Sequence, residues 1–385
     1  MIVSFNRSVP VLFGAGASLR TGLKLKEMGV MKVFCVHDKG IKDAGIADII
    51  LSNLKAAGLE VIVFDGVMAD PPDTVINEAA AMANKQQVDG VVGIGGGSAM
   101  DTAKGVNVLL TNPPPINQYY VGSGAVIKPG KPLVLLPTTA GTGSEMTAIS
   151  VVSDTASRTK KGVIGPAAIA TLAIVDPELM LGLPPHITAS TGMDAFSHAA
   201  EALTSGGMNP MSDTLAEKAI SLITENLLKA VNNGSDLTAR TNMSFAALLA
   251  GIAFNDALTH WGHALAHTIG AYYHIPHGVG CAVALPGVIE YVADAVPEKV
   301  EQIAKAMGIS LSKDLSPEEL GNEVAGAIRR LNREAGIPGL KDFNIEESSL
   351  EQIVGNVLAD DCAMFGPKRA SAKQILSMLK RAYAS

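Results

Sequence analysis

Residues 90–104 read GVVGIGGGSAMDTAK, and this stretch decides the fold class of the chain. A short apolar run ends at Ile94, three glycines and Ser98 follow, and a helix-forming segment begins at Ala99. A strand, a glycine loop and a helix in this order let backbone N–H groups and the helix N-terminus approach a diphosphate. A tight turn needs fewer than three glycines, so we interpret residues 95–98 as a phosphate-binding loop of an α/β domain.

Short β-rich runs alternate with helical segments on both sides of this loop, from residue 1 to about residue 185. Such alternation indicates βαβ units and a parallel sheet covered on both faces, which binds ligands beyond the carboxyl ends of its strands. The strands expected are 32–37, 61–64, 90–94 and 132–137, and the helices expected are 41–57 and 74–85.

The second half of the chain shows helical periodicity and few strand signals. It follows proline punctuation at 176–177 and 184–185. We therefore predict an α/β domain at 1–185 and a helical domain at 186–385, with a cleft between them. The helices expected are 190–203, 212–231, 237–257, 297–307, 316–334 and 372–383.

The composition excludes several classes of protein. Hydrophobic residues make up 48% of the 385 residues and charged residues 17%, which excludes a disordered chain. The net charge is −7, from 30 basic and 37 acidic residues, and the basic pairs are isolated, so we expect no nucleic-acid partner. Cys35, Cys281 and Cys362 are too few and too widely spaced for a disulfide framework and fit a reducing compartment.

Targeting signals are not visible in the sequence. Residues 1–10 contain Asn6 and Arg7 and no long apolar core, so we expect no signal peptide. No apolar run reaches the roughly 18 residues of a membrane span, because glycine, proline and polar residues interrupt each one. We expect a cytoplasmic protein without a membrane partner.

Three further segments are candidates for cofactor contacts. PTTAGTGSE at 137–145 follows a strand, and its hydroxyls could hydrogen-bond a ribose, a phosphate or a nicotinamide amide, although such loops also occur without a ligand. Asp38 closes the strand 32–37, where a carboxylate accepts from a ribose hydroxyl and repels a 2′-phosphate; this favours NAD over NADP, with an ordinary loop aspartate as the alternative. FGAGAS at 13–18 begins like a dinucleotide fingerprint, but Leu19 stands at the third glycine position and no strand clearly precedes it. We interpret it as a structural turn.

Five of the eight histidines lie between residues 260 and 277. Asp194 and His198 are four residues apart, and His263 and His267 repeat that spacing, which places each pair on one face of a helix. Two helices and a following loop can therefore bring one carboxylate and up to three imidazoles to a divalent cation. Nitrogen and oxygen ligands without thiolate suit Fe²⁺, Zn²⁺, Mn²⁺ or Ni²⁺.

Spacing alone leaves the last ligand open. A four-ligand site would include one later histidine, such as His277, which follows the expected end of a helix. His267 would then be available as a proton donor or substrate contact, since imidazoles titrate near neutral pH. We interpret His260 and His274 as histidines without a metal.

With these segments assigned, the chain resembles the iron-containing (group III) alcohol dehydrogenase family. The resemblance extends from the turn at 13–14 to about residue 362, nearly the whole chain. Its most specific motifs are GGGSxxDxAK (95–104), PTTAGTGSE (137–145), DPEL (176–179), GMDAxxHAxE (192–201) and HxxxH…PHG (263–278).

The resemblance implies a Rossmann-like α/β N-terminal domain plus an all-α C-terminal domain, the dehydroquinate synthase-like or iron alcohol dehydrogenase fold, with cofactor and metal in the cleft. It implies NAD(H), a divalent metal with Fe²⁺ ahead of Zn²⁺, Mn²⁺ or Ni²⁺, and a homodimer or larger homo-oligomer. It places His267 near the nicotinamide and substrate. The metal ligands that it implies are Asp194, His198, His263 and His277.

The resemblance also implies cofactor and substrate contacts. Phe254 and Cys362 match positions that line the substrate pocket in some members of the family. Lys160 is matched by its distance to Asp176, with Lys161 as the neighbouring alternative. The cofactor-binding positions are Asp38, Gly95, Gly96, Gly97, Ser98, Asp101, Thr138, Thr139, Thr142 and Lys160.

A few residues depart from the family pattern. Thr259-His260-Trp261 replaces small and aliphatic residues before the first of the two later metal histidines, and Asp70 stands where asparagine is common. The metal and phosphate motifs are intact, so these departures concern the substrate rather than the reaction class. One hypothesis is a substrate with an anionic or polar group that His260 or Lys368 meets.

The resulting hypothesis is reversible hydride transfer between NAD(H) and a small primary alcohol/aldehyde pair, with the metal as Lewis acid. Two alternatives use the same fold: a glycerol dehydrogenase-like enzyme and a dehydroquinate synthase-like enzyme. A third is a non-catalytic NAD- or metal-binding protein.

Overall fold

The computed structural model describes residues 9–157 and 159–384, which form two units that divide between Gly182 and Leu183. The sequence predicts this boundary at residue 185. The signal-peptide expectation depends mainly on residues 1–8, which lie outside the described residues.

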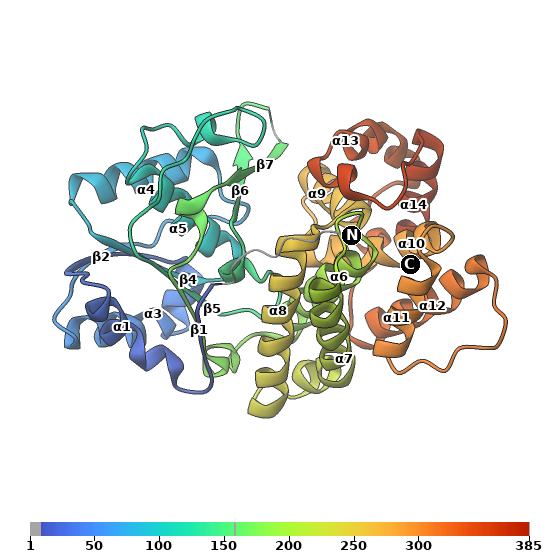
Figure 1. The fold of residues 1–385 in the computed structure, drawn as a ribbon, viewed down its shortest axis with the longest axis horizontal. Helices are drawn as coiled ribbons and strands as arrows, with labels where there is room; N and C mark the ends of the chain where they lie inside the picture. The colour runs from blue at the N-terminus through green and yellow to red at the C-terminus, as the bar shows by residue number, and fades with distance from the viewer. Residues whose placement is uncertain (1–8, 158, 385) are drawn as a thin grey trace. The chain divides into compact units, whose positions relative to one another are not determined.

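The N-terminal unit is built on a six-stranded sheet in the order β1-β8-β5-β4-β2-β3, and every neighbouring pair is parallel (Figure 1). The parallel sheet expected from the sequence is therefore present. A separate antiparallel hairpin consists of β6 and β7. The strands are β1 (Val11–Phe13), β2 (Lys32–Val36), β3 (Glu60–Phe64), β4 (Gly90–Gly95), β5 (Leu133–Pro137), β6 (Ile149–Asp154), β7 (Thr159–Ile164) and β8 (Leu172–Val175).

Helices cover both faces of this sheet (Figure 1). Val33 and Cys35 of β2 belong to the apolar cluster that also contains Leu25 of α1 and Ile50 of α3. On the other face, Gly93 of β4 lies so close to α5 that an added Cβ would be 2.8 Å from Ala103 Cβ. Burial on both faces explains why these strands are continuous apolar runs. The helices are α1 (Thr21–Glu27), α2 (Lys39–Asp43), α3 (Ile46–Ala56), α4 (Asp73–Lys85) and α5 (Gly97–Leu109).

Two sequence predictions in this unit need correction. The helix expected over 41–57 is divided into α2 and α3, because Gly45 adopts a left-handed φ of 74° that a helix interior does not allow. The turn at 13–18 is preceded by a strand, β1, which pairs with β8. In that turn the backbone N–H groups of Gly16 and Ser18 donate to the Asp176 carboxylate, at 3.1 and 3.0 Å. Those two donors serve the protein's own carboxylate, as a structural turn requires.

The strand order locates the ligand-binding edge of the sheet. The chain leaves β2 toward β3 and leaves β4 toward β5, in opposite directions along the sheet. Open α/β sheets bind ligands outside the carboxyl ends of strands at such a switch point. In this chain Asp38 follows β2 and the glycine loop follows β4.

The C-terminal unit is helical, as expected. Of the six helices expected, α6, α7 and α14 extend beyond the expected ranges, α8 coincides with its range, and α11 and α12 are one residue shorter. His277, expected in a loop, is the first residue of α10. The helices are α6 (Pro185–Thr204), α7 (Pro210–Asn232), α8 (Leu237–Ala257), α9 (Trp261–Tyr273), α10 (His277–Val292), α11 (Pro297–Ala306), α12 (Pro317–Glu334), α13 (Val354–Leu358) and α14 (Ala372–Ala384).

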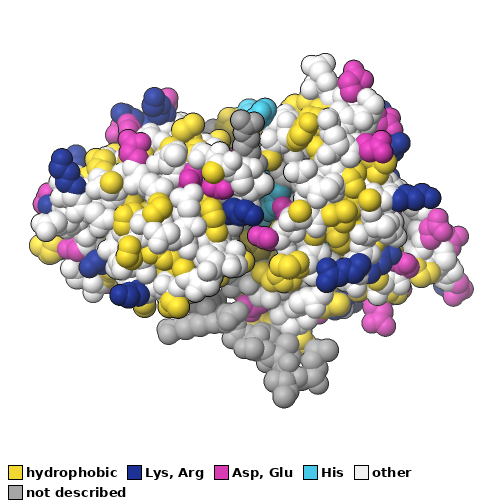
Figure 2. All heavy atoms as spheres, turned by 90° about the horizontal axis from the view of Figure 1, so that it is seen from above, with side chains coloured by type: hydrophobic (Ala, Val, Ile, Leu, Met, Phe, Trp, Pro, Cys, Tyr) yellow, Lys and Arg dark blue, Asp and Glu magenta, His cyan; other side chains and the backbone are white. Residues whose placement is uncertain are grey.

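One helix among the described residues, α8, is long and apolar enough to cross a membrane by length and composition. Of its most apolar window, 61% is buried inside the protein. A buried core helix passes the same test, so these properties alone do not make α8 a membrane span. On the face drawn in Figure 2, Lys and Arg side chains are interspersed with Asp and Glu.

Candidate active site

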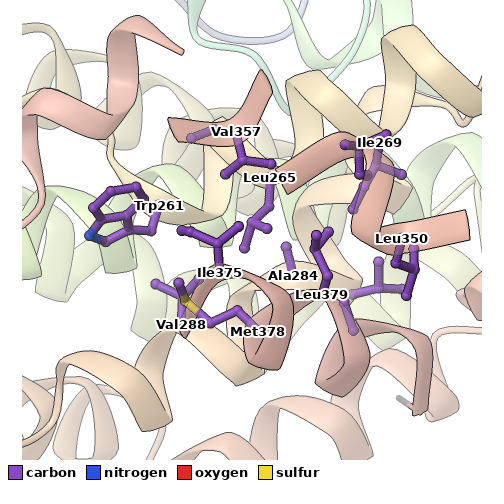
Figure 3. Packing of buried hydrophobic residues seen from close by; sticks show 14 of the residues in the cluster. Trp261, Leu265, Ile269, Ala284, Val288, Leu350, Val357, Ile375, Met378 and Leu379 are labelled. Carbon is purple, nitrogen blue, oxygen red and sulfur yellow. The ribbon is translucent and has the colours of Figure 1, made fainter. Parts of the chain in front are cut away.

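Helix α9 presents two different faces. Trp261, Leu265 and Ile269, spaced four residues apart, enter a buried apolar cluster with side chains of α10, α13 and α14 (Figure 3). His263 and His267 are each two residues from these positions, about 200° around the helix. The packing of one face therefore fixes the direction in which both imidazoles point.

The four side chains expected to bind a metal converge. Asp194 Oδ1 of α6 lies 3.8 Å from His263 Nε2, 3.5 Å from His277 Nε2 and 3.8 Å from His198 Nδ1. The His198 and His263 ring centroids are 4.5 Å apart. One carboxylate oxygen is thus surrounded by three imidazoles from α6, α9 and α10.

The unpaired atoms of this cluster fit a divalent cation. Asp194 Oδ1 and His263 Nε2 are both buried and have no hydrogen-bond partner. A buried carboxylate oxygen without a donor is costly, and a cation held by oxygen and nitrogen removes that cost. Such a donor set suits first-row divalent metals.

A sulfur atom also belongs to the cluster. One potential ligand atom each from Asp194, His263, His277 and Cys281 lie within 4.8 Å of one another. Cys281 is one helical turn after His277 on α10, and its Sγ is 3.5 Å from His277 Nε2. The sequence predicts a site without thiolate; the i, i+4 spacing from His277 is the signal that indicates Cys281.

Glu201 and His260 lie behind the metal cluster. The Glu201 side chain is fully buried and accepts from the backbone N–H of Gly262 at 2.6 Å and from His263 Nδ1. Burial alone would raise the pKa of Glu201, but His260 and His263 outweigh it and lower the pKa to about 2. His260 is also fully buried, and its Nε2 pairs with Thr204 Oγ1 at 2.8 Å.

The substrate hypothesis built on His260 and Lys368 is therefore not supported. His260 is enclosed by protein groups and cannot reach a substrate. Lys368 bonds Asp294 and lies over the Tyr291 ring at 4.2 Å. The His260 imidazole and the Lys368 ammonium group already have partners within the protein.

His267 has a partner that the sequence analysis missed. Its Nδ1 lies 3.1 Å from Asp360 Oδ2, and its ring stacks on His277 with a centroid separation of 5.4 Å. Asp360 directly precedes the 3₁₀ helix η8 (Asp361–Phe365), 93 residues after His267. No local spacing connects the two residues, so only the fold could reveal the pair.

The two residues expected in the substrate pocket lie near these groups. The Phe254 ring stacks on His198, with centroids 4.2 Å apart and planes 14° apart. The Cys362 Sγ is 3.6 Å from Thr259 Oγ1, and Cys362 shares a cluster of potential metal ligands with His267 and Asp360.

The glycine loop connects β4 to α5, with Gly96 as the N-cap. Gly95 has a φ of 147°, and an added Cβ would be 2.7 Å from Ala99 Cβ. A Cβ on Gly97 would be 2.9 Å from Thr142 Cγ2, so this glycine is needed for close packing. The first N–H groups of α5, from Gly97 and Ser98 onward, have no acceptor within the helix and can serve a phosphate.

The threonine tract lies against this loop. Thr138 donates its N–H to Gly95 O at 3.0 Å, and both Thr139 Oγ1 and Thr142 Oγ1 are 3.5 Å from where Cβ atoms of Gly96 and Gly97 would be. Thr139 Oγ1 is buried without a hydrogen-bond partner. The two sequence motifs therefore form one structural unit.

Asp38 and Lys160 lie at different parts of this unit. Asp38 caps α2 through Ile41 N, and its Oδ2 is 3.7 Å from where a Gly95 Cβ would be. Lys160 Nζ donates to Asp70 Oδ1 at 2.7 Å, and Asp70 N donates to Ser98 Oγ at 3.2 Å. Asp70, noted above as a departure from the family pattern, thus connects Ser98 and Lys160.

A buried charged network braces the two cofactor motifs. Lys104 Nζ is fully buried and donates to Ser144 Oγ, Thr147 Oγ1 and Ile149 O, at 2.7 to 3.0 Å. Asp101 accepts from Ser144 Oγ at 2.8 Å and from Val151 N at 3.2 Å. The Asp101 carboxylate therefore serves the protein itself.

The network shifts the pKa values of its members. Burial lowers the pKa of Lys104 to about 8 and raises the pKa of Glu145 to about 7. Burial also raises the pKa of Asp101, against the opposing effect of Lys104. Glu145 Oε2 is buried without a hydrogen-bond partner.

Comparisons with known proteins identify the family of this chain. The family model "Iron-containing alcohol dehydrogenase" matches residues 9–177, and "Fe-containing alcohol dehydrogenase family, C-terminal" matches residues 188–383. The NAD-dependent methanol dehydrogenase of Bacillus methanolicus is 37% identical over 96% of this chain and 97% of the relative. The 1,3-propanediol dehydrogenase of Klebsiella pneumoniae is 39% identical over 96% of each chain.

The fold is similar to that of solved members. A crystal structure of a 1,3-propanediol oxidoreductase matches 99% of this chain and 100% of its own, with a TM-score of 0.93 and 38% identity. The matches cover both units, and they include the glycine loop and the histidine cluster. The chain belongs to the iron-containing alcohol dehydrogenase family.

Proposed function

We propose that this protein transfers a hydride between NAD(H) and a small primary alcohol/aldehyde pair, with a divalent metal, Fe²⁺ in first place, held by Asp194, His198, His263 and His277. The observation that carries the proposal is the pair of buried, unpartnered atoms, Asp194 Oδ1 and His263 Nε2, 3.8 Å apart. The bound metal would supply Lewis-acid polarisation of the substrate oxygen, and the nicotinamide would supply or accept the hydride.

The choice of NAD(H) is supported by the switch point of the sheet. The N–H groups at the start of α5 would bind the diphosphate, and Asp38 beside Gly95 would accept from a ribose hydroxyl. A carboxylate there repels a 2′-phosphate. The relative from Bacillus methanolicus is named NAD-dependent, which agrees with this choice.

A small substrate is supported by the side chains around the metal ligands. The Phe254 ring covers one face of His198, which leaves less room beside the ligands. Two of the similar proteins are named for methanol and 1,3-propanediol, both small primary alcohols. The family assignment favours this dehydrogenase over the synthase-like and non-catalytic alternatives.

His267 would act as the proton donor or acceptor of the reaction. Its Nδ1 is engaged by Asp360, which leaves Nε2 to donate to or accept from the substrate or a ribose hydroxyl. Asp360 and the stacked His277 ring fix the plane of the His267 imidazole.

We also propose that the protein is cytoplasmic and forms a homodimer or larger homo-oligomer. Light scattering would test the oligomeric state.

An anaerobic screen of the iron-loaded protein tests the proposal. Short aldehydes are supplied as substrates with NADH or NADPH, and oxidation of the cofactor is followed by its absorbance. We expect turnover of short primary aldehydes with NADH, weaker turnover with NADPH, and loss of turnover after chelation. Equal rates before and after complete metal removal would contradict the proposal.

A further inference from the structure

Glu201 makes more contacts than capping a helix requires. It follows Asp194 by seven residues on α6, and its side chain is fully buried. Its Oε1 accepts from the backbone N–H of His260 at 3.2 Å and of Gly262 at 2.6 Å. Its Oε2 accepts from the backbone N–H of His263 at 3.1 Å and from the His263 ring through Nδ1. One carboxylate thus binds three backbone donors and one imidazole.

We infer that Glu201 is a positioning residue for the metal site, which fixes His263 in the tautomer whose Nδ1 carries the proton. Both oxygens of Glu201 accept backbone N–H groups, three in all, as an ionised carboxylate does, so the His263 Nδ1 is the donor in their contact. The lone pair then lies on His263 Nε2, which is the buried, unpartnered atom facing Asp194 Oδ1. This inference rests on the proposed metal site.

The local structure is built around this contact. Gly262 leaves room for the carboxylate, since an added Cβ would be 2.9 Å from Glu201 Cδ and Oε1. The N-cap residue of α9, His260, makes no side-chain capping bond, so Glu201 supplies from α6 the acceptor that α9 lacks. The same carboxylate therefore fixes both the start of α9 and the ring of His263, the metal ligand on this helix.

The direction of the ring matters for metal affinity. A histidine that ligates through one nitrogen needs its other nitrogen held by an acceptor, which sets the tautomer and increases the basicity of the ligand. Loss of such a partner lowers metal affinity by about 10–100-fold. In Glu201→Gln, one of the two oxygens is replaced by an amide N–H₂ group, which is a donor and would face N–H donors. The His263 tautomer would then no longer be fixed.

The experiment compares Glu201→Gln with the wild-type full-length protein. Zn²⁺ and anaerobic Fe²⁺ are titrated against a fluorescent chelator, and the rate of metal release is measured. We expect about 10–100-fold weaker affinity and faster release in E201Q. Asp236→Ala is the matched control, because Asp236 caps α8 through Ala239 N and has no part in the cluster. It should lose stability and keep wild-type metal affinity.

A second measurement does not depend on the variant folding. A neutron structure of the wild-type protein should show a deuteron on His263 Nδ1, toward Glu201, and none on Nε2. A deuteron on Nε2 with Nδ1 bare would overturn the inference, as would wild-type metal affinity in E201Q. If the wild-type protein itself binds neither Zn²⁺ nor Fe²⁺, the proposed function fails and the inference fails with it. Tight binding by wild type and E201Q alike would overturn the inference alone.

Discussion

His267 Nδ1 lies 3.1 Å from Asp360 Oδ2, while the other oxygen of the same carboxylate accepts the N–H of Cys362 at 2.9 Å. Asp360 therefore has two separate roles. One carboxylate oxygen caps the 3₁₀ helix η8, and the other orients the His267 imidazole beside the metal ligands. Burial would raise the pKa of Asp360, but the neighbouring His267 outweighs it and lowers that pKa.

Substitution at Asp360 should separate these two contributions. Asp360→Ser can still accept from Cys362 N but is too short to reach His267, whereas Asp360→Asn can accept from Cys362 N through its oxygen and donate its amide N–H to His267 Nδ1. We expect D360S to lower kcat by about 10–100-fold, with a small change in KM, because the ring orientation needed for proton transfer is lost. D360N should retain more activity. Steady-state kinetics with an aldehyde and NADH measure both, and a wild-type kcat in D360S would contradict the orienting role.

Replacing His263 should remove the metal and the turnover together. The His263→Ala variant leaves Asp194 Oδ1 with one imidazole fewer, so metal content measured after dialysis should fall to near background. Exposed His274 provides the control, since His274→Asn suits the left-handed φ of 57° at this position and removes a histidine outside the cluster. Full activity in metal-free H263A would refute the ligand assignment.

Removing the charge of Asp38 should relax the cofactor preference. Asp38→Ser keeps a side chain that caps α2 and removes the repulsion of a 2′-phosphate. We expect the ratio of kcat/KM for NADPH over NADH to rise by about tenfold or more, since a nearby like charge costs about 1–4 kcal/mol. Asp43→Ser removes an exposed carboxylate from the same helix and should leave the ratio unchanged.

Buried Glu145 and Lys104 should give stability a defined pH dependence. The pKa of Glu145 is raised to about 7, so the folded state holds its proton more tightly and stability falls as pH rises from about 4.5 to 7. The pKa of Lys104 is lowered to about 8, so the folded lysine loses its proton first and stability rises as pH increases from about 8 to 10.5. Each contribution is about 3 kcal/mol, because each pKa differs from its usual value by about 2.5.

Calorimetry between pH 5 and about pH 10 tests the direction in which stability changes with pH in each window. The difference in unfolding temperature between the wild-type protein and Glu145→Gln should change over the acidic window only. The difference from Lys104→Met should change over the alkaline window only. A pH-independent difference for either variant would show that the corresponding group is not titrating as proposed.

The central strands could be predicted because their sequence signals are local. β4 and β5 are apolar runs bounded by glycine or proline, and the structure has them within one residue of the expected limits. The division of the helix at Gly45 was missed because the hydrophobic period continues across it. β1 was missed because three residues give no periodicity, and its partners in β8 are 162 residues away. The hairpin β6–β7 was missed because Lys160 and Lys161 interrupt its apolar pattern.

The candidate site likewise has residues that the sequence predicts and residues that only the fold reveals. The pairs Asp194–His198 and His263–His267 follow from helical spacing, and the structure brings the first pair and His263 to one point. Glu201 is on the same face of α6 as Asp194, but no spacing rule indicates which backbone groups it would meet. Asp360 reaches His267 only through the packing of a distant segment.

The bonds from Gly16 and Ser18 to Asp176 have a consequence for synthesis on the ribosome. The strand made first, β1, has β8 as its neighbour in the sheet, and β8 is translated last among the strands of this unit. While the nascent chain lengthens, β2 to β5 can associate, but β1 has to wait for residues 172–176 to emerge. Assembly of this unit during translation therefore finishes with the pairing of β1 and β8, and a ribosome that stalls before that point leaves a strand edge open to foreign chains.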